Sequence, residues 1–184
     1  MPVVVRPDTF SMVRFEAAEV QGIVEKLVAD IGLPDDLPVT IEIDETTPMG
    51  RAEVASVDPI VISAESGALE DAKAPRRLSA AGTADVLGKL LFSVRDRLDP
   101  DFGDPPAEDD LTLQESVAWE VHCVARLGRL GHPVQRQRRL YQFRTRHGFN
   151  DASDAAFDAL WDGDGLTWAD IERLSTSATA GAAA

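Results

Sequence analysis

The first half of the chain shows the alternating pattern of β-strands, with one helical stretch among the strands. A run of valines opens a predicted short strand within residues 2–10, and the apolar–polar alternation of residues 37–44 predicts a half-buried strand. Residues 51–63 are interrupted by Asp58-Pro59 and predict two short strands or one bulged strand, because proline cannot donate to a ladder. Residues 15–31 repeat apolar side chains at helical spacing and predict a helix.

The second half of the chain follows the helical period. Helices are predicted for residues 79–98, 111–130, 133–147, 151–161 and 168–174. Pro133 suits the first turn of its helix, because an N–H at that position has no partner within the helix and proline lacks the N–H. Residues 99–110 are rich in Pro, Asp and Gly and predict a loop. Residues 175–184 are almost all small and predict a disordered tail.

This order of elements predicts an α+β fold. We expect a small, mostly N-terminal β-sheet packed against a helical C-terminal half, because each element must cover its apolar face. A chain of 184 residues with 44% apolar residues is typical of one domain with its own core. The sequence therefore predicts a single domain over residues 1–174.

Composition and charge indicate a protein that is neither membrane-spanning nor a general binder of nucleic acid. The sequence shows neither a secretory signal pattern nor an apolar run long enough to span a bilayer, so we expect no membrane association. A single cysteine excludes an internal disulfide and favours a reducing compartment, which predicts a cytoplasmic location. The net charge of −14 opposes the approach of nucleic acid or anionic membrane to the surface as a whole.

One segment departs from this acidic composition. Residues 121–150 contain seven arginines and no Asp or Glu, and they also contain every histidine and the only cysteine. The histidines and the cysteine lack the close ligand pairs of zinc sites, so we expect no metal and no cofactor. Cys123 is expected to pack as a small hydrophobic side chain.

Glu120 occupies an unusual position in this segment's first helix. On a helical wheel of residues 111–130 it falls within the apolar arc, where a carboxylate is costly unless paired. If the next helix folds back, position 120 lies nearest residues 143–144, so we expect Arg144 rather than Arg136 as its partner. Two interpretations remain: a structural ion pair between helices, or a carboxylate–guanidinium site that orients a ligand.

The remaining polar residues suggest an outer surface. Glu115, His122 and Arg126 are predicted on the helix face opposite the apolar arc. Arg138, Arg139 and Arg146 are predicted to project away from the apolar side of the next helix. The aromatic residues Tyr141, Phe143 and Phe149 lie among the arginines, a composition typical of phosphate-tracking surfaces. We favour pairing of these arginines with the chain's own 32 carboxylates or with an acidic partner, and we do not expect nucleic acid.

The order of elements over residues 15–130 resembles a minimal zincin metallopeptidase domain. In that family the first core helix carries H-E-x-x-H, and the second often supplies a glutamate ligand followed three residues later by alanine. Glu115-Ser116-Val117-Ala118 resembles this second element. Residues 83–91 of the first core helix contain no histidine, so zinc cannot be held in the family's way. The resemblance therefore implies a zincin-like pseudoenzyme without metal.

We conclude from the sequence that the protein is a non-catalytic binding domain whose partner is an unknown protein or anionic ligand. The alternatives are a hydrolase with an atypical acid–base or metal site, and local nucleic-acid or polyanion binding through the arginines of residues 126–146. The candidate ligand-binding residues are Glu115, Glu120, His122, Arg126, Arg136, Arg138, Arg139, Arg144 and Arg146.

Overall fold

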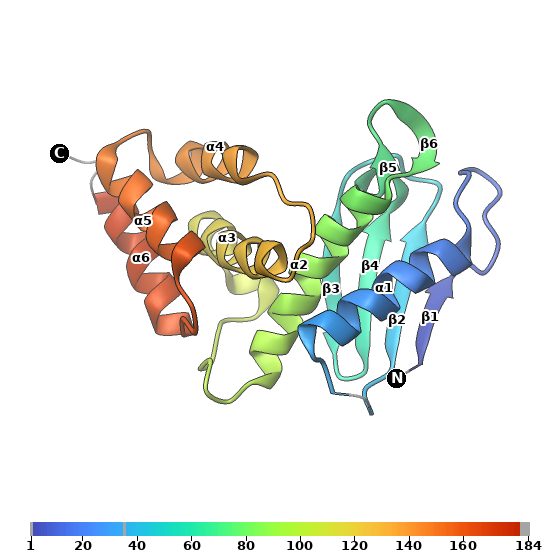
Figure 1. The fold of residues 1–184 in the computed structure, drawn as a ribbon, viewed down its shortest axis with the longest axis horizontal. Coiled ribbons are helices and arrows are strands. Elements are labelled where there is room, and N and C mark those ends of the chain that lie inside the picture. Colours follow the sequence, from blue (N-terminus) through green and yellow to red (C-terminus); the bar gives the residue numbers. More distant parts are fainter. Residues whose placement is uncertain (1, 35, 181–184) are drawn as a thin grey trace. The chain divides into compact units, whose positions relative to one another are not determined.

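The computed structural model describes residues 2–34 and 36–180 and has the predicted α+β fold, with 53% helix and 17% strand. The chain divides into two compact units, residues 1–95 and 96–184, and the division falls near the end of helix α2 (Ala80–Leu98). Figure 1 shows the sheet within the first unit and the later helices within the second. Folding as a single domain over residues 1–174 stays a prediction.

The first unit is built on a four-stranded mixed sheet. Its strands are β1 (Val3–Arg6), β2 (Val39–Asp44), β3 (Ala52–Val57) and β4 (Ile60–Glu65), arranged in the order β1-β2-β4-β3. The pairs β1–β2 and β2–β4 are parallel, whereas β3 runs antiparallel to β4 at the edge. Of the two patterns predicted for residues 51–63, two separate strands is therefore the one observed.

Two helices cover one face of this sheet, α1 (Ala17–Ile31) and the part of α2 that belongs to the first unit (Figure 1). Gly32 ends α1 in the left-handed conformation with φ 74°, and its N–H donates to the carbonyl of Val28 at 3.0 Å. Every second residue of three strands is buried, as the alternation predicted: Val3, Val5, Val39, Ile41, Ile43, Ile60, Ile62 and Ala64. These side chains form the core of the first unit.

A small hairpin precedes α2 and was not predicted. It consists of β5 (Glu70–Asp71) and β6 (Ala74–Leu78), which pair antiparallel and follow a single 3-10 turn (Ser66–Ala68). The strands are too short to show a period, and a proline in β6 argues against a strand by propensity.

In the described part of the second unit, a 3-10 turn (Glu108–Asp110) precedes four α-helices: α3 (Leu113–Arg129), α4 (Arg136–His147), α5 (Asp151–Asp162) and α6 (Trp168–Ala180). Helix α3 packs against the other three. Its buried residues lie on all sides: Ala118, Trp119, Val121, His122, Cys123, Val124, Ala125 and Leu127. Helix α3 is therefore the central helix of this unit.

Helix α6 extends further than the sequence predicted. It continues to Ala180, and Ser175 and Ala178 are buried. The prediction of a disordered tail from residue 175 is therefore wrong for residues 175–180, because small side chains allow this helix end to pack closely. Residues 181–184, the rest of the predicted tail, lie outside the described residues.

Within residues 2–34 and 36–180, none of the helices combines the length and the apolar character required to cross a membrane.

Candidate functional site

The arginines of residues 121–150 lie on α3 and α4, and most of them are bound within the second unit. Five of the seven contact acceptors there: Arg126 with Asp96, Arg129 with two backbone carbonyls of the α5 end, Arg136 with Asp158, Arg139 with Glu120, and Arg144 with Asp154. The arginine-rich composition therefore arises mainly from internal pairing with carboxylates of neighbouring helices.

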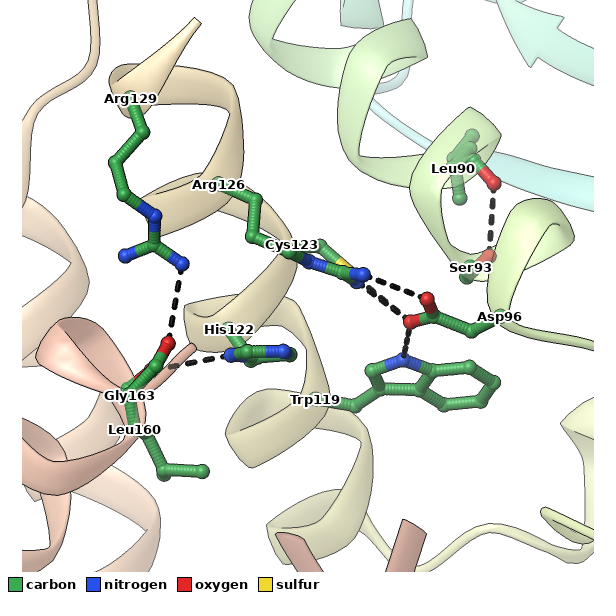
Figure 2. Close-up of polar contacts among 10 residues, drawn as sticks. All are labelled: Leu90, Ser93, Asp96, Trp119, His122, Cys123, Arg126, Arg129, Leu160 and Gly163. Atoms are coloured by element: carbon green, nitrogen blue, oxygen red, sulfur yellow. Dashed lines mark hydrogen bonds and ion pairs between the residues drawn. The ribbon is translucent and has the colours of Figure 1, made fainter. Parts of the chain in front are cut away.

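The most buried of these contacts centres on Asp96, which is only 3% exposed. Figure 2 shows its carboxylate between Arg126 and the indole of Trp119. The two terminal nitrogens of Arg126 donate to the two carboxylate oxygens at 2.7 and 2.6 Å, and Trp119 Nε1 donates to Asp96 Oδ2 at 2.7 Å. A buried carboxylate is tolerated when it is paired and hydrogen-bonded in this way. Arg126 is thus a structural partner, although the helical wheel predicted it on an outer face.

Cys123 lies beside this ion pair and is buried. Its Sγ is 3.5 Å from a terminal nitrogen of Arg126 and 4.0 Å from Asp96 Oδ2. Burial raises the pKa of the Cys123 thiol to about 12, and the nearby guanidinium offsets this only in part. The thiol is therefore neutral. The predicted burial of Cys123 is confirmed, but its sulfur contacts the buried ion pair and not only apolar side chains.

His122 was predicted on the outer face of its helix, and this prediction is wrong. The side chain is 1% exposed, and its Nδ1 lies 3.3 Å from the backbone oxygen of Leu160 on α5 (Figure 2). Burial, followed by the nearby charge of Arg126, lowers the pKa of His122 to about 4. Arg129 also donates to α5, to the backbone oxygens of Trp161 and Gly163 at 2.8 and 3.1 Å. Helix α5 therefore covers the polar side of α3 as well.

Glu120 pairs with Arg139, so the prediction of Arg144 as its partner is wrong. The reason lies in the connection between α3 and α4. Val134 Cγ2 lies 2.8 Å from the position that a Cβ at Gly128 would occupy, so the connection runs back over the last turns of α3. Helix α4 then starts at Arg136, beyond Pro133, which is not in its first turn. This shifts the pairing toward the beginning of α4. The prediction that Arg139 projects outward is wrong as well, because this pairing leaves Arg139 only 7% exposed.

Two further candidate arginines bind to α5. Arg144 makes a two-point contact with the carboxylate of Asp154 at 2.7 and 2.6 Å. Arg136 donates to Asp158 at 2.6 Å and lies over the ring of Phe157, with 5.1 Å to the ring centroid. Both arginines therefore join α4 to α5.

Glu115 takes part in a capping box at the start of α3. Its Oε2 accepts from the N–H and the hydroxyl of Thr112 at 2.9 and 2.8 Å, and the Thr112 hydroxyl accepts from the Glu115 N–H at 3.2 Å. The sequence carries the signal of this capping box, a Thr followed three residues later by Glu. Glu115 thus stabilises a helix end, which leaves its predicted role in ligand binding without structural support.

The other two candidate arginines and two aromatic residues are exposed, three of them on α4 and one just after it, and we call these four the α4 surface: Arg138, Tyr141, Arg146 and Phe149. Phe143, the third aromatic residue predicted among these arginines, is buried instead. Tyr141 and Phe149 are 65% and 66% exposed, and their rings meet edge to face at 5.9 Å between centroids. Within the described part of the chain, neither Arg138 nor Arg146 has a carboxylate partner. Arg138 and Tyr141 lie three residues apart on one helix and are therefore neighbours on its surface.

A shallow hollow in the first unit was not predicted from the sequence. It has a volume of about 590 Å³ and lies at the carboxyl ends of β1, β2 and β4, where open sheets often bind ligands. Three of its carboxylates are engaged with the protein itself: Asp44 accepts from two threonine hydroxyls, Glu65 accepts from the Arg51 N–H, and Glu53 pairs with the Arg51 side chain. The hydrogen bonds from Thr46 and Thr47 hold the pKa of Asp44 below its ordinary value.

No group of three His, Cys, Asp or Glu side chains that could hold a metal ion occurs among the residues that the structure describes. We found no match to the chain among protein-family models, curated proteins or solved structures. The resemblance to a zincin-like domain therefore stays a prediction.

Proposed function

We propose that this protein is a non-catalytic binding protein that docks an acidic segment of a partner protein on the α4 surface. One observation carries the proposal. Tyr141 and Phe149 form an exposed aromatic pair, and Arg138 lies next to Tyr141 on α4, which also carries the exposed Arg146. The other arginines of α4 are paired within the unit.

Aromatic and arginine side chains are the residues most enriched at the centres of protein interfaces. Burying Tyr141 and Phe149 under a partner would remove apolar area from water, which the folded chain leaves exposed. The two arginines would select carboxylates at the rim, because complementary charge mainly determines specificity and the rate of association. An acidic peptide with apolar side chains matches both features.

The same residues could stack the bases of a single nucleic-acid strand. The net charge of −14 disfavours that occupant, because a nucleic acid carries a charge on every phosphate along its length. A short acidic segment carries fewer charges, and those beyond the Debye length of about 8 Å are screened at physiological salt. We therefore favour the protein partner.

Separate contacts of the candidate acid–base residues support a non-catalytic role. Glu115 binds Thr112, Glu120 binds Arg139, and His122 contacts the backbone of α5. These residues do not converge on a common point where a substrate could react. A zincin-like origin as a pseudoenzyme is a further part of the proposal, supported by the order of α1, β2–β4 and α2 and by the lack of histidine in α2. The reducing, cytoplasmic location expected from the single cysteine is part of it as well.

Fluorescence anisotropy with a labelled twelve-residue peptide, four repeats of Glu-Glu-Leu, tests the proposal. We expect binding that weakens with added salt and becomes about tenfold weaker in the double variant Arg138→Gln/Arg146→Gln and in Tyr141→Ser. The matched control is Arg173→Gln, which removes an exposed arginine that is paired with Asp170.

Equal affinity of the peptide for the variants and the wild type would refute the assignment of the α4 surface, and so would the absence of binding. A second titration with a labelled dT12 strand separates the two occupants. Tighter binding of dT12 than of the peptide would replace the proposed partner with single-stranded nucleic acid.

A further inference from the structure

Two arginines of the first unit face each other across adjacent backbone segments. Arg14, just before α1, forms a parallel β-bridge with Arg77 of β6, and its N–H donates to the carbonyl of Arg76 at 2.7 Å. Side chains directly opposed in such a bridge are close neighbours, and like charges in that position destabilise the pairing. We call Arg14, Arg76 and Arg77 the arginine bridge.

Acidic side chains do not neutralise the positive charge of the arginine bridge. All three side chains are exposed, and within residues 2–34 and 36–180 none of them has a carboxylate partner. The nearest acidic residues of the hairpin are bound to backbone N–H groups. Glu70 accepts from the N–H of Arg76 at 2.8 Å, and Asp71 accepts from that of Lys73 at 2.9 Å. A chain with 32 acidic residues thus leaves three adjoining arginines without an ion pair.

The backbone holds these arginines in a costly arrangement. Arg76 has φ 65°, which lies in the left-handed region of backbone conformation. Residues other than glycine and asparagine rarely adopt this region. Helix α2 starts at Ala80, three residues after Arg77, and its first turn contains no acidic residue. The N–H groups at a helix start favour a nearby anion, and here the Ser79 hydroxyl already accepts from one of them, the N–H of Gly82. Figure 1 shows the β5–β6 hairpin beside this end of α2.

We propose that the arginine bridge binds a phosphate-type dianion, either inorganic phosphate or the phosphate group of a small metabolite. One anion between Arg14 and Arg77 would convert their repulsion into two charge-assisted contacts, since each guanidinium can donate two parallel hydrogen bonds to phosphate oxygens. Arg76 and Lys73 add positive potential from the hairpin. The acidic groups that oppose this binding are Glu16, exposed two residues from Arg14, and the hairpin carboxylates of Glu70 and Asp71. This site is separate from the α4 surface and does not depend on the function proposed for it.

Thermal unfolding of the full chain, with and without inorganic phosphate, tests the site at constant ionic strength set by chloride. We expect phosphate to raise the Tm of the wild type, because a ligand that binds only the folded state stabilises it. The variant Arg77→Gln is expected to melt above the wild type in chloride and to lose the shift caused by phosphate. The opposite signs of these effects distinguish a ligand site from a structural role of Arg77.

Isothermal titration compares the affinities of inorganic phosphate and glycerol phosphate. The ligand that binds more tightly shows whether the site takes free phosphate or the phosphate group of a small metabolite. We expect about tenfold weaker binding in Arg14→Gln and in Arg77→Gln, and tighter binding in Glu16→Gln. The control Arg51→Gln removes an exposed arginine that is paired with Glu53 in the same unit and should leave the affinity unchanged. Phosphate shifts in Arg77→Gln equal to those of the wild type, or equal effects of chloride and phosphate, would overturn the proposal.

Discussion

The two units differ in the polar groups that they bury beside apolar side chains. In the first unit the buried polar residues are Ser66 and Thr83, among the residues that the structure describes. In the second unit they are Asp96, His122, Arg139, His147, Ser153 and Ser175, which include two charged and two titratable side chains. The first unit therefore depends mainly on apolar burial, which is largely additive, whereas the second also depends on pairs whose members are costly when separated.

Removing the counterion of the buried guanidinium should have the largest effect. Asp96→Asn leaves Arg126 buried without a compensating charge and weakens three hydrogen bonds, so we expect a loss of about 3–5 kcal/mol in the free energy of unfolding. Urea unfolding followed by tryptophan fluorescence measures this loss. The control Glu108→Gln breaks the exposed ion pair with Arg97 and should cost about 0–1 kcal/mol. Equal effects of the two substitutions would show that the buried Asp96–Arg126 pair stabilises the second unit no more than the Arg97–Glu108 pair does.

A core deletion in the first unit tests whether the units unfold together. Ile41 is completely buried in β2, so Ile41→Ala should cost about 2–5 kcal/mol. All three tryptophans (Trp119, Trp161 and Trp168) belong to the second unit, so their fluorescence reports on that unit alone. Because α2 continues unbroken past the division, we expect the variant to shift the fluorescence and the circular dichroism transitions equally. A shift in circular dichroism alone would show that the units unfold independently.

The buried imidazole of His122 should make the second unit sensitive to acid. The pKa of His122 is about 4 in the folded protein, below its ordinary value of 6.5. The unfolded chain therefore binds a proton that the folded chain does not, and stability falls as the pH drops from 6.5 to 4. The expected loss over this window is about 3 kcal/mol. Urea unfolding at pH 7 and pH 4.5 should show a smaller pH effect in His122→Gln than in the wild type, and an identical effect would contradict the assignment.

The smallest effect is expected at the helix start. Glu115→Ala removes the acceptor of the Thr112 N–H and hydroxyl, and should lower stability by about 1 kcal/mol. Binding of the Glu-Glu-Leu peptide should not change, since Glu115 is a capping residue. If this substitution abolished peptide binding without affecting stability, Glu115 would return to the list of ligand-binding residues.

The comparison also explains what the sequence could predict. The first unit follows periodicity, so the strands, α1 and α2 were found with bounds within a few residues. The exception is the β5–β6 hairpin, whose strands are too short to carry a period. Gly32 marked the end of α1 in the sequence as it does in the structure.

The second unit was predicted as helices but not as a packed arrangement. A helical wheel assigns one buried face, whereas α3 is enclosed by α4, α5 and α6, so the predicted outer position of His122 was wrong. The partner of Glu120 depends on the path of the loop formed by residues 130–135. The apolar periodicity of the sequence does not predict the path of a loop. Asp96 lay in a different predicted helix from Arg126, so their pairing required the fold. Two helix caps of this unit carry local sequence signals, the capping box of Thr112 and Glu115 and the Asn150 side chain that accepts from the Ser153 N–H.

The burial of Cys123 makes its rate of chemical labelling a measure of how often the second unit opens. The chain contains one cysteine, and this thiol is neutral and enclosed by its neighbours on α3. A thiol reagent can modify it only when the helix around it opens, since attack requires both access and the thiolate form. The rate of labelling in excess reagent therefore counts the openings of α3, without competition from any second thiol. Small losses of packing around Asp96 would be seen as faster labelling long before they shift a melting curve.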